Sequence, residues 1–267
     1  MKLSVAYSPC PNDTFMFHGV AAGAVCRGGI QPEVHLADVE TLNRLAMEGR
    51  YDVTKLSFHA WLLVRERYEL CAAGAALGFG CGPVLVAARD IGREEIPRCR
   101  IAVPGELTTA HLLLRLWAPR AREKLFVRYD RVMDLVAAGR ADVGAVIHEG
   151  RFTYRQAGLR LVADLGQWWQ EQTALPIPLG GIAVRRSLGA RLCREVEAML
   201  RESIEAALAR PERTREYMRQ HAREMDEAVL AEHVQTFVND YSLDLGEQGR
   251  RAVAKLEELA RAAGIIG

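Results

Sequence analysis

Gly82-Pro83-Val84-Leu85-Val86-Ala87-Ala88-Arg89 reads as a glycine-led apolar strand that ends on a basic residue. Gly180-Gly181-Ile182-Ala183-Val184-Arg185-Arg186 repeats this pattern, and the two stretches bracket the middle third of the chain. If they mark the points where the chain passes between two lobes and back, near 82–89 and 180–186, the first lobe is discontinuous. It would comprise residues 1–86 plus 182–267, and the second lobe residues 87–181. The alternative is two ordinary strands of one sheet.

Outward from these stretches, short apolar strands alternate with helical segments through the first two-thirds of the chain. The predicted strands are Leu3–Tyr7, Glu33–Ala37, Val53–Leu56, Val84–Ala88, Ile101–Val103, Leu125–Val127, Val143–Ile147 and Leu161–Asp164. The predicted helices include Thr14–Val25, Val39–Met47, Thr108–Trp117 and Val132–Ala138. Such alternation is typical of α/β proteins with mostly parallel sheets flanked by helices. We therefore predict a two-lobed α/β fold with a ligand cleft between the lobes.

The last third has a different pattern, because residues from Ser187 to Ala263 read almost entirely as helix. Apolar residues recur there at helical spacing, and Pro211 predicts the start of a new helix. Further helices are expected over about 226–239 and from about Glu247 onward. We expect these helices to pack on a sheet.

Composition limits the classes of partner. Among 267 residues, 35 basic side chains balance 34 acidic ones, so the formal charge is +1. Nucleic-acid and membrane-surface proteins carry an excess or a cluster of basic residues, and neither class is expected here. A small neutral or anionic ligand fits the balance better. The sequence does not set the oligomeric state, and a homodimer stays open.

The expected location is the cytoplasm. The first residues lack the apolar segment of a secretory signal, and the six cysteines form no C-x-x-C pair, which favours reduced thiols. The uncharged run from Leu70 to Ala88 is long enough for a membrane span. Its glycines and Pro83 favour strand, turn and strand instead.

Polar residues follow four predicted strands, and ligands of open α/β sheets bind beyond the carboxyl ends of strands. These residues include Ser8, Asn12 and Asp13 after the first strand, Lys55, Ser57 and His59, then Thr108 and Thr109, and finally His148. Three of these strand ends lead into helices, whose free N–H groups favour an anion such as a carboxylate. Helix capping by Asp13, Thr14, Thr108 or Thr109 is the simpler explanation of each single case.

His148 is the sharpest candidate, because a titratable ring stands where a buried strand stops. It would act as a general base near neutral pH, or be a hydrogen-bonded structural histidine. His18, His59 and His111 fall inside predicted helices and are assigned to packing or surface. Lys55 would pair with a carboxylate or form a Schiff base, and the charge role is favoured.

Other chemistry-bearing patterns are weak or missing. Trp168-Trp169 would stack on an aromatic substrate or, more commonly, pack in the core. The glycine-rich run Gly78–Gly82 precedes a strand, so it is no dinucleotide fingerprint, and no P-loop, H-E-x-x-H or G-x-S-x-G motif occurs. No His/Cys cluster has zinc spacing. We therefore expect neither an organic cofactor nor a metal.

Ser8-Pro9-Cys10-Pro11-Asn12-Asp13-Thr14-Phe15 resembles the signature of the 1,4-dihydroxy-6-naphthoate synthases, which act in the futalosine route to menaquinone. The similarity spans nearly the whole chain. It continues through Lys55-Leu56-Ser57, Gly78–Pro83, Thr109-Ala110, Val146–Gly150, Val238–Tyr241 and Asp244–Gly246. The first segment and the His148 segment are the specific ones.

The resemblance implies a periplasmic-binding-protein-like type II fold used as a carbon–carbon lyase. Such an enzyme converts cyclic dehypoxanthinyl futalosine to 1,4-dihydroxy-6-naphthoate and a three-carbon fragment. It implies His148 as the proton acceptor and a carboxylate substrate held by Lys55, Leu56, Ser57, Thr109 and Ala110. The strand-end argument adds Ser8, Asn12 and Asp13 to these substrate-binding residues. Cys10, between two prolines, is interpreted as a packing residue.

Two rival functions share the expected fold. A solute-binding protein for a transporter would bind a small molecule without chemistry, and the missing signal segment counts against it. Chorismate dehydratase, the sister enzyme of the same pathway, is the second rival. The Ser8–Phe15 segment favours the synthase.

Overall fold

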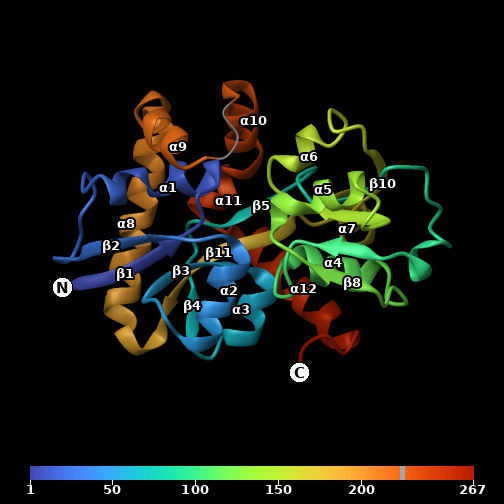
Figure 1. Ribbon diagram of the computed structural model, residues 1–267. Coiled ribbons are helices and arrows are strands. Elements are labelled where there is room, and N and C mark those ends of the chain that lie inside the picture. The colour runs from blue at the N-terminus through green and yellow to red at the C-terminus, as the bar shows by residue number, and fades with distance from the viewer. Residues whose placement is uncertain (223–225) are drawn as a thin grey trace.

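The first of two β-sheets gathers strands from both ends of the chain. The computed structural model describes residues 1–222 and 226–267. The first sheet has the strand order β2-β1-β3-β11-β4, and β5 also pairs with β11. Its strands are β1 (Lys2–Tyr7), β2 (Gln31–Leu36), β3 (Val53–Ser57), β4 (Tyr68–Leu70), β5 (Ala76–Gly78) and β11 (Ile177–Arg185). The two sheets lie side by side, with the N-terminus in the first (Figure 1).

The second sheet is built from the middle of the chain. Its order is β10-β6-β9-β7-β8. The strands are β6 (Val84–Ala87), β7 (Ile101–Val103), β8 (Lys124–Phe126), β9 (Val143–Val146) and β10 (Arg160–Asp164). The α/β fold class is therefore confirmed. Both sheets are mixed: β1 with β2 and β3, and β7 with β8 and β9, run parallel, while β6, β10 and β11 enter as antiparallel strands.

The chain changes sheet twice, as the repeated glycine-led pattern suggests. It leaves the first sheet between β5 and β6 and returns between β10 and β11. The strands assigned to each sheet place both passages slightly earlier in the chain than predicted. The first comes before Val84, and the second comes before Ile177. At the first change a side chain is excluded, because a Cβ at Gly82 would lie 2.3 Å from the Cα of Gly166. The lobe limits 1–86 plus 182–267 and 87–181 stay a prediction.

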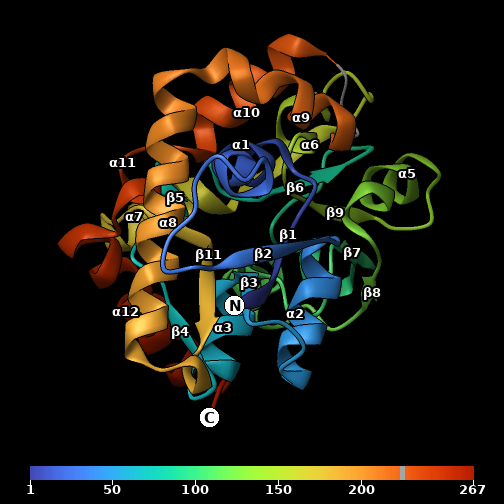
Figure 2. The same cartoon turned by 90° about the vertical axis from the view of Figure 1, so that its left-hand side faces the viewer.

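Helices cover both faces of the first sheet. α1 (Pro11–Ala21) and α8 (Ala190–Ala209) pack on one face, where Leu3, Val5 and Tyr7 point. α2 (Val39–Glu48) and α3 (Phe58–Val64) pack on the other, with Leu56 and Ala183. Figure 2 shows the sheet between α1 and the α2–α3 pair. Alternating strand residues thus bury two separate cores.

The second sheet is covered in the same way, with alternate residues of β6 facing opposite sides. Val84 and Val86 meet α5 (Val132–Ala137). Leu85 and Ala87 join a larger core with α4 (Thr109–Trp117), α7 (Leu165–Thr173) and α12 (Gly246–Ala262). The remaining helices are α6 (Gly150–Thr153), α9 (Arg215–His221), α10 (Glu227–Phe237), α11 (Asp240–Leu243) and the 3-10 turns Ile96–Arg98, Tyr129–Arg131, Arg186–Leu188 and Pro211–Thr214.

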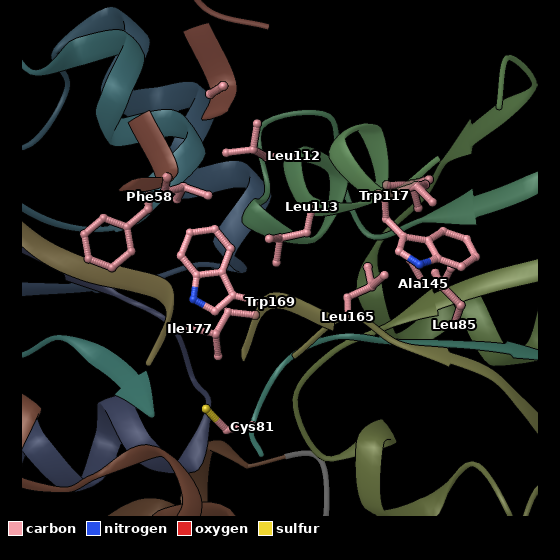
Figure 3. Packing of buried hydrophobic residues seen from close by; sticks show 14 of the residues in the cluster. Phe58, Cys81, Leu85, Leu112, Leu113, Trp117, Ala145, Leu165, Trp169 and Ile177 are labelled. Atoms are coloured by element: carbon pink, nitrogen blue, oxygen red, sulfur yellow. The ribbon is translucent and has the colours of Figure 1, made fainter. Parts of the chain in front are cut away.

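The larger core also joins the two sheets. Figure 3 shows Trp169 between Phe58, Leu113 and Ile177, with Leu85 and Ala145 of the second sheet farther along the cluster. Trp169 is fully buried, and its indole N–H donates to the Pro176 carbonyl at 3.0 Å. The core-packing interpretation of this tryptophan is therefore confirmed.

Two sequence expectations need correction and one is confirmed. The first helix begins at Pro11 and not at Thr14, because Cys10 is its N-cap and proline suits the first helical position. The helix expected to start at Pro211 opens as a 3-10 turn, followed by α9. The run from Leu70 to Ala88 forms β5, a turn and β6 as expected. Within the described residues, no helix is long and apolar enough to cross a membrane.

Candidate active site

A cavity of about 90 Å³ lies where the first and second sheets meet, beyond the carboxyl ends of β1, β3, β7 and β9. The structure brings every residue of the predicted site into its wall. These residues are Ser8, Asn12, Asp13, Lys55, Leu56, Ser57, Thr109, Ala110 and His148. Residues far apart in the sequence thus converge, because the carboxyl ends of the parallel strands β1 and β3 of the first sheet meet those of β7 and β9 of the second.

Asp13 and Lys55 form a buried ion pair on the first-sheet side of the cavity. The Lys55 Nζ donates to Asp13 Oδ1 at 2.7 Å. The same carboxylate accepts hydrogen bonds from the Ser8 amide and hydroxyl, at 3.2 and 2.6 Å, and from Asn12 Nδ2 at 3.0 Å. Asp13 is therefore not the helix cap that its position suggests, since its oxygens are used by Lys55, Ser8 and Asn12.

Ser57 is held by a neighbouring amide. Its backbone N–H donates to Asn43 Oδ1 at 2.9 Å, and its hydroxyl accepts from Asn43 Nδ2 at 3.1 Å. That pairing does not use the hydroxyl hydrogen of Ser57, which can donate to a bound molecule. Asn43 lies on α2 and is fully buried.

Thr109 and Ala110 lie in the first turn of α4. Thr108 is the N-cap, and its side chain accepts from the His111 amide, which confirms the capping expectation for Thr108. The Thr109 hydroxyl is committed elsewhere, donating to the Leu179 carbonyl at 2.6 Å. What α4 offers the cavity is therefore its N-terminal end, where backbone N–H groups attract an anion.

His148 follows β9 in a strained backbone conformation. Its φ is +56°, in the left-handed region that non-glycine residues seldom adopt. The ring is half-buried, with its Nε2 3.8 Å from the Cys10 Sγ and the Tyr129 ring at 4.9 Å between centroids. Burial lowers the pKa of His148, and the negative charges of Glu149 and Asp13 partly oppose that shift. The imidazole is thus neutral near pH 7 and able to accept a proton.

Cys10 is buried against this ring, in agreement with its assignment as a packing residue. Burial, together with the charges of Glu149 and Asp13, raises the pKa of the Cys10 thiol well above its ordinary value. A thiol that stays protonated is a poor nucleophile. Cys10 therefore contacts the candidate base without being a candidate for covalent chemistry.

His233 was not found by sequence reasoning, although it belongs to the same network. It is fully buried on α10, and its Nε2 lies 3.0 Å from Asn12 Oδ1. Its ring is nearly parallel to that of His148, at 6.1 Å between centroids. A single histidine in an amphipathic helix carries no local signal, and only the packing of α10 onto α1 shows its place.

Other lining residues also escaped prediction, among them Val39, Arg151, Leu179 and Phe237. Arg151 is already paired: its guanidinium donates to the Gly82 carbonyl at 2.5 Å and to Asp164 at 2.7 Å. Arg151 therefore stabilises the segment at Gly82, where the chain passes to the second sheet, beside the cavity. Gly82 and Pro83 line the cavity too, so the weak glycine-rich segment does contribute to the site.

The other predicted histidines have structural positions, as expected. His18 is half-buried on α1 beside Tyr217. His59 Nδ1 is 3.3 Å from the Thr108 carbonyl, and burial lowers the pKa of His59 to about 4. His111 Nδ1 lies 2.7 Å from the Glu106 carbonyl. Across the described parts of the chain, no group of three or more His, Cys, Asp or Glu side chains could hold a metal.

The fold and the cavity together define an α/β protein with a periplasmic-binding-protein-like fold, whose site between two sheets is lined by both polar and apolar residues. A Candida albicans protein described as having the generic periplasmic binding protein fold aligns with a TM-score of 0.73 at 12% identity, covering 100% of this chain and 91% of that one. A crystal structure of a protein from Archaeoglobus fulgidus aligns with a TM-score of 0.94 at 40% identity, covering 99% and 98%. The fold expected from the sequence is confirmed.

Sequence relatives narrow the class. The model of the menaquinone biosynthesis family matches residues 3–262, and the chain belongs to that family. A 1,4-dihydroxy-6-naphthoate synthase of Thermus thermophilus is 48% identical, covering 98% of this chain and 95% of its own length. The synthase of Streptomyces coelicolor is 42% identical, covering 99% and 94%. The resemblance carried by Ser8–Phe15 and the His148 segment is thereby confirmed.

Proposed function

We propose that this chain cleaves a carbon–carbon bond of cyclic dehypoxanthinyl futalosine, releasing 1,4-dihydroxy-6-naphthoate and a three-carbon fragment, with His148 as general base. The observation that carries the proposal is the position of His148, whose neutral ring lines the same cavity as all eight expected substrate-binding residues. Membership in a menaquinone biosynthesis family supports the choice of pathway.

The chemistry needs one base and no group beyond the chain's own residues. His148 accepts the proton of a substrate hydroxyl, and that oxygen becomes a carbonyl as the adjacent carbon–carbon bond breaks. The electron pair of the broken bond is taken up by a carbonyl of the ring, as in a retro-aldol reaction, and the resulting enolate oxygen takes back the proton held by His148 to become a hydroxyl of the product. Aromatisation of the naphthoate product then drives the step. A base whose pKa lies below 6.5 is unprotonated at neutral pH and ready for this role.

The rest of the cavity would hold the substrate. The N–H groups at the start of α4, at Thr109 and Ala110, suit the aryl carboxylate. Ser57 offers its hydroxyl hydrogen, and Leu56 an apolar surface. The 2.7 Å contact with Asp13 supports a charge role for Lys55 over a Schiff base. Ser8, Asn12 and Asp13 would act mainly by fixing Lys55.

The cellular setting is part of the same proposal. The six cysteines are all unpaired, which fits reduced thiols in the cytoplasm. A homodimer, and the lobe limits 1–86 plus 182–267 and 87–181, also stay predictions.

The test is turnover by the purified protein. We expect cyclic dehypoxanthinyl futalosine to yield 1,4-dihydroxy-6-naphthoate, detected by chromatography and mass spectrometry, without added metal or cofactor. Chorismate, supplied in parallel, should remain unchanged. No naphthoate at any pH between 5 and 9, from protein that is folded by circular dichroism, would sink the proposal. Consumption of chorismate would instead favour the rival function, chorismate dehydratase.

A further inference from the structure

Glu40 connects the two halves of the cavity wall. It lies on α2, which packs against β3 of the first sheet, and reaches the loop between β7 and α4 on the second-sheet side. Its Oε1 accepts from the Glu106 amide and its Oε2 from the Leu107 amide, both at 3.0 Å. One carboxylate thus binds two consecutive N–H groups of a loop that leads directly into the cavity.

The contact is close and largely closed to solvent. The Glu40 side chain is 13% exposed. A Cβ at Gly105 would lie 2.5 Å from Glu40 Oε2, and Gly105 has φ +129°, so a glycine is required there on both counts. Arg44 Nη2 lies 3.0 Å from Glu40 Oε1 and 3.5 Å from Glu106 Oε2, closing the contact on its outer side. These features indicate a specific, well-packed contact between α2 and the loop that precedes α4.

The loop that Glu40 holds, between β7 and α4, is connected to the start of α4 by hydrogen bonds. The Thr108 hydroxyl donates to the Gly105 carbonyl at 2.9 Å and accepts from the His111 amide at 3.3 Å. His111 Nδ1 lies 2.7 Å from the Glu106 carbonyl. Residues 105–111 are therefore linked by hydrogen bonds, and the Thr109 hydroxyl ties the first turn of α4 to the Leu179 carbonyl of β11 as a second anchor. Release of Glu106 would loosen the N–H groups of Thr109 and Ala110.

We propose that Glu40 is a positioning residue, which holds the first turn of α4 against the first sheet so that its N–H groups face the bound substrate. The role in substrate binding rests on the proposed function. Glu40 itself is not among the residues that line the cavity, whereas its neighbour Val39 is. It acts through the backbone of another element, not on the substrate.

This role predicts a specific kinetic signature. The N–H groups at α4 would hold the substrate carboxylate, which does not change charge in the reaction, equally in the ground and transition states. Loss of such uniform binding raises KM and leaves kcat nearly unchanged. His148 is positioned by β9, not by the loop that contains Glu106. A substitution of Glu40 should therefore leave the proton transfer undisturbed.

The first experiment compares Glu40→Ala and Glu40→Gln with Glu48→Ala, an exposed glutamate on the same helix. Removing two hydrogen bonds to a carboxylate should raise KM about tenfold in Glu40→Ala, with kcat within about threefold of the wild type. Glu40→Gln, which keeps one acceptor oxygen, should lie between. Gly105→Ala should reproduce the Glu40→Ala pattern. Glu48→Ala should match the wild type.

The second experiment needs no substrate. Hydrogen–deuterium exchange of the amides of residues 105–108 should be at least about tenfold faster in Glu40→Ala than in the wild type, with α12 as an internal control for global stability. Unchanged exchange in this segment overturns the proposal, as does unchanged KM or a collapse of kcat. If the wild type makes no naphthoate, the proposed function fails, while the exchange rates still decide whether Glu40 holds the loop.

Discussion

The two walls of the cavity differ in how completely their polar groups are paired. On the first-sheet side, Asp13 accepts four hydrogen bonds, and Lys55 and Ser57 each have a partner. On the second-sheet side, His148 sits in a left-handed conformation, and Oε2 of its neighbour Glu149, which is not among the residues that line the cavity, has no hydrogen-bond partner among the described residues. The Asp13–Lys55 pair is thus built to keep its shape, although Nδ1 of His233 beside Asn12 has no hydrogen-bond partner among the described residues. The segment of His148 and Glu149 keeps capacity for a new proton or a new hydrogen bond.

This contrast has a physical basis. Buried ionic groups are tolerated when their lone pairs and protons are satisfied, as they are around Asp13. Backbone strain and unsatisfied polar atoms persist where the surrounding structure fixes them, and they concentrate at reactive sites. We therefore expect changes in the second wall to affect the reaction, and changes in the first wall to affect stability and binding. The predictions below test that division.

The largest expected effect is on turnover by His148→Asn. Asparagine tolerates the left-handed conformation, so the backbone should be kept while the base is removed. We expect kcat to fall by about 10²- to 10⁴-fold, the usual contribution of a general base, with little change in KM. Steady-state kinetics and substrate titration of the same variant would measure both. His35→Asn on β2, outside the cavity, is the matched control. Near-normal kcat in His148→Asn would remove this residue from its role.

Asp13→Asn should act chiefly on stability. It leaves the Lys55 ammonium buried without its counter-ion, which costs about 3–5 kcal/mol. In a chain of this size that corresponds to a drop in Tm of roughly 10 °C. Thermal and urea unfolding would measure it, with Glu69→Gln in the exposed Arg186–Glu69 pair as a control that should change Tm little. A Tm equal to that of the wild type would contradict the picture of a rigid first wall.

The sequence predicted which residues line the cavity better than it predicted the hydrogen bonds between them. Strand periodicity located Ser8, Lys55, Ser57, Thr109 and His148, because neighbouring parallel strands of each sheet end at one edge, and the edges of the two sheets meet at the cavity. Side-chain contacts between different elements leave no local pattern, so the pairing of His233 on α10 with Asn12 on α1, and of Asn43 on α2 with Ser57 of β3, was not foreseen.

The prediction of strands was limited in a similar way, by the strength of the local sequence pattern. Strands with strong alternation or apolar runs were placed within a residue or two, whereas β4 was missed, since three residues carry too little pattern. Local rules also favour Asp13 as a helix cap, the alternative to its expected role in substrate binding. The capping rule failed because a partner from β3, Lys55, competes for the same carboxylate.

Lys55→Arg separates charge from covalent chemistry within the first wall. A guanidinium keeps the positive charge beside Asp13 but cannot form an imine. We expect kcat to fall no more than about tenfold, because the changed geometry, not a lost nucleophile, is responsible. Trapping with borohydride in the presence of substrate should give no adduct in the wild type. A covalent adduct on Lys55, or complete loss of turnover in a folded Lys55→Arg protein, would favour the Schiff base.

The smallest effect concerns the charge beside the base, and it is read from pH. Burial holds the pKa of His148 below its ordinary value of 6.5, and the base acts only when unprotonated, so kcat/KM should rise with pH through a midpoint below 6.5 and then level off. Glu149 opposes that shift, since its negative charge favours the imidazolium. Glu149→Gln should therefore move the acid limb to lower pH.

At pH 7.5, where His148 is neutral in both proteins, the lower basicity in Glu149→Gln should reduce kcat only about two- to fivefold. Glu171→Gln, an exposed change on α7, is the control and should leave the profile in place. Rate profiles from pH 4.5 to 9 would measure the shift. A limb that moves to higher pH in Glu149→Gln would mean that Glu149 does not act on His148 as a nearby negative charge. The oxygen of Glu149 that lacks a hydrogen-bond partner among the described residues would then have no part in setting the pKa of His148.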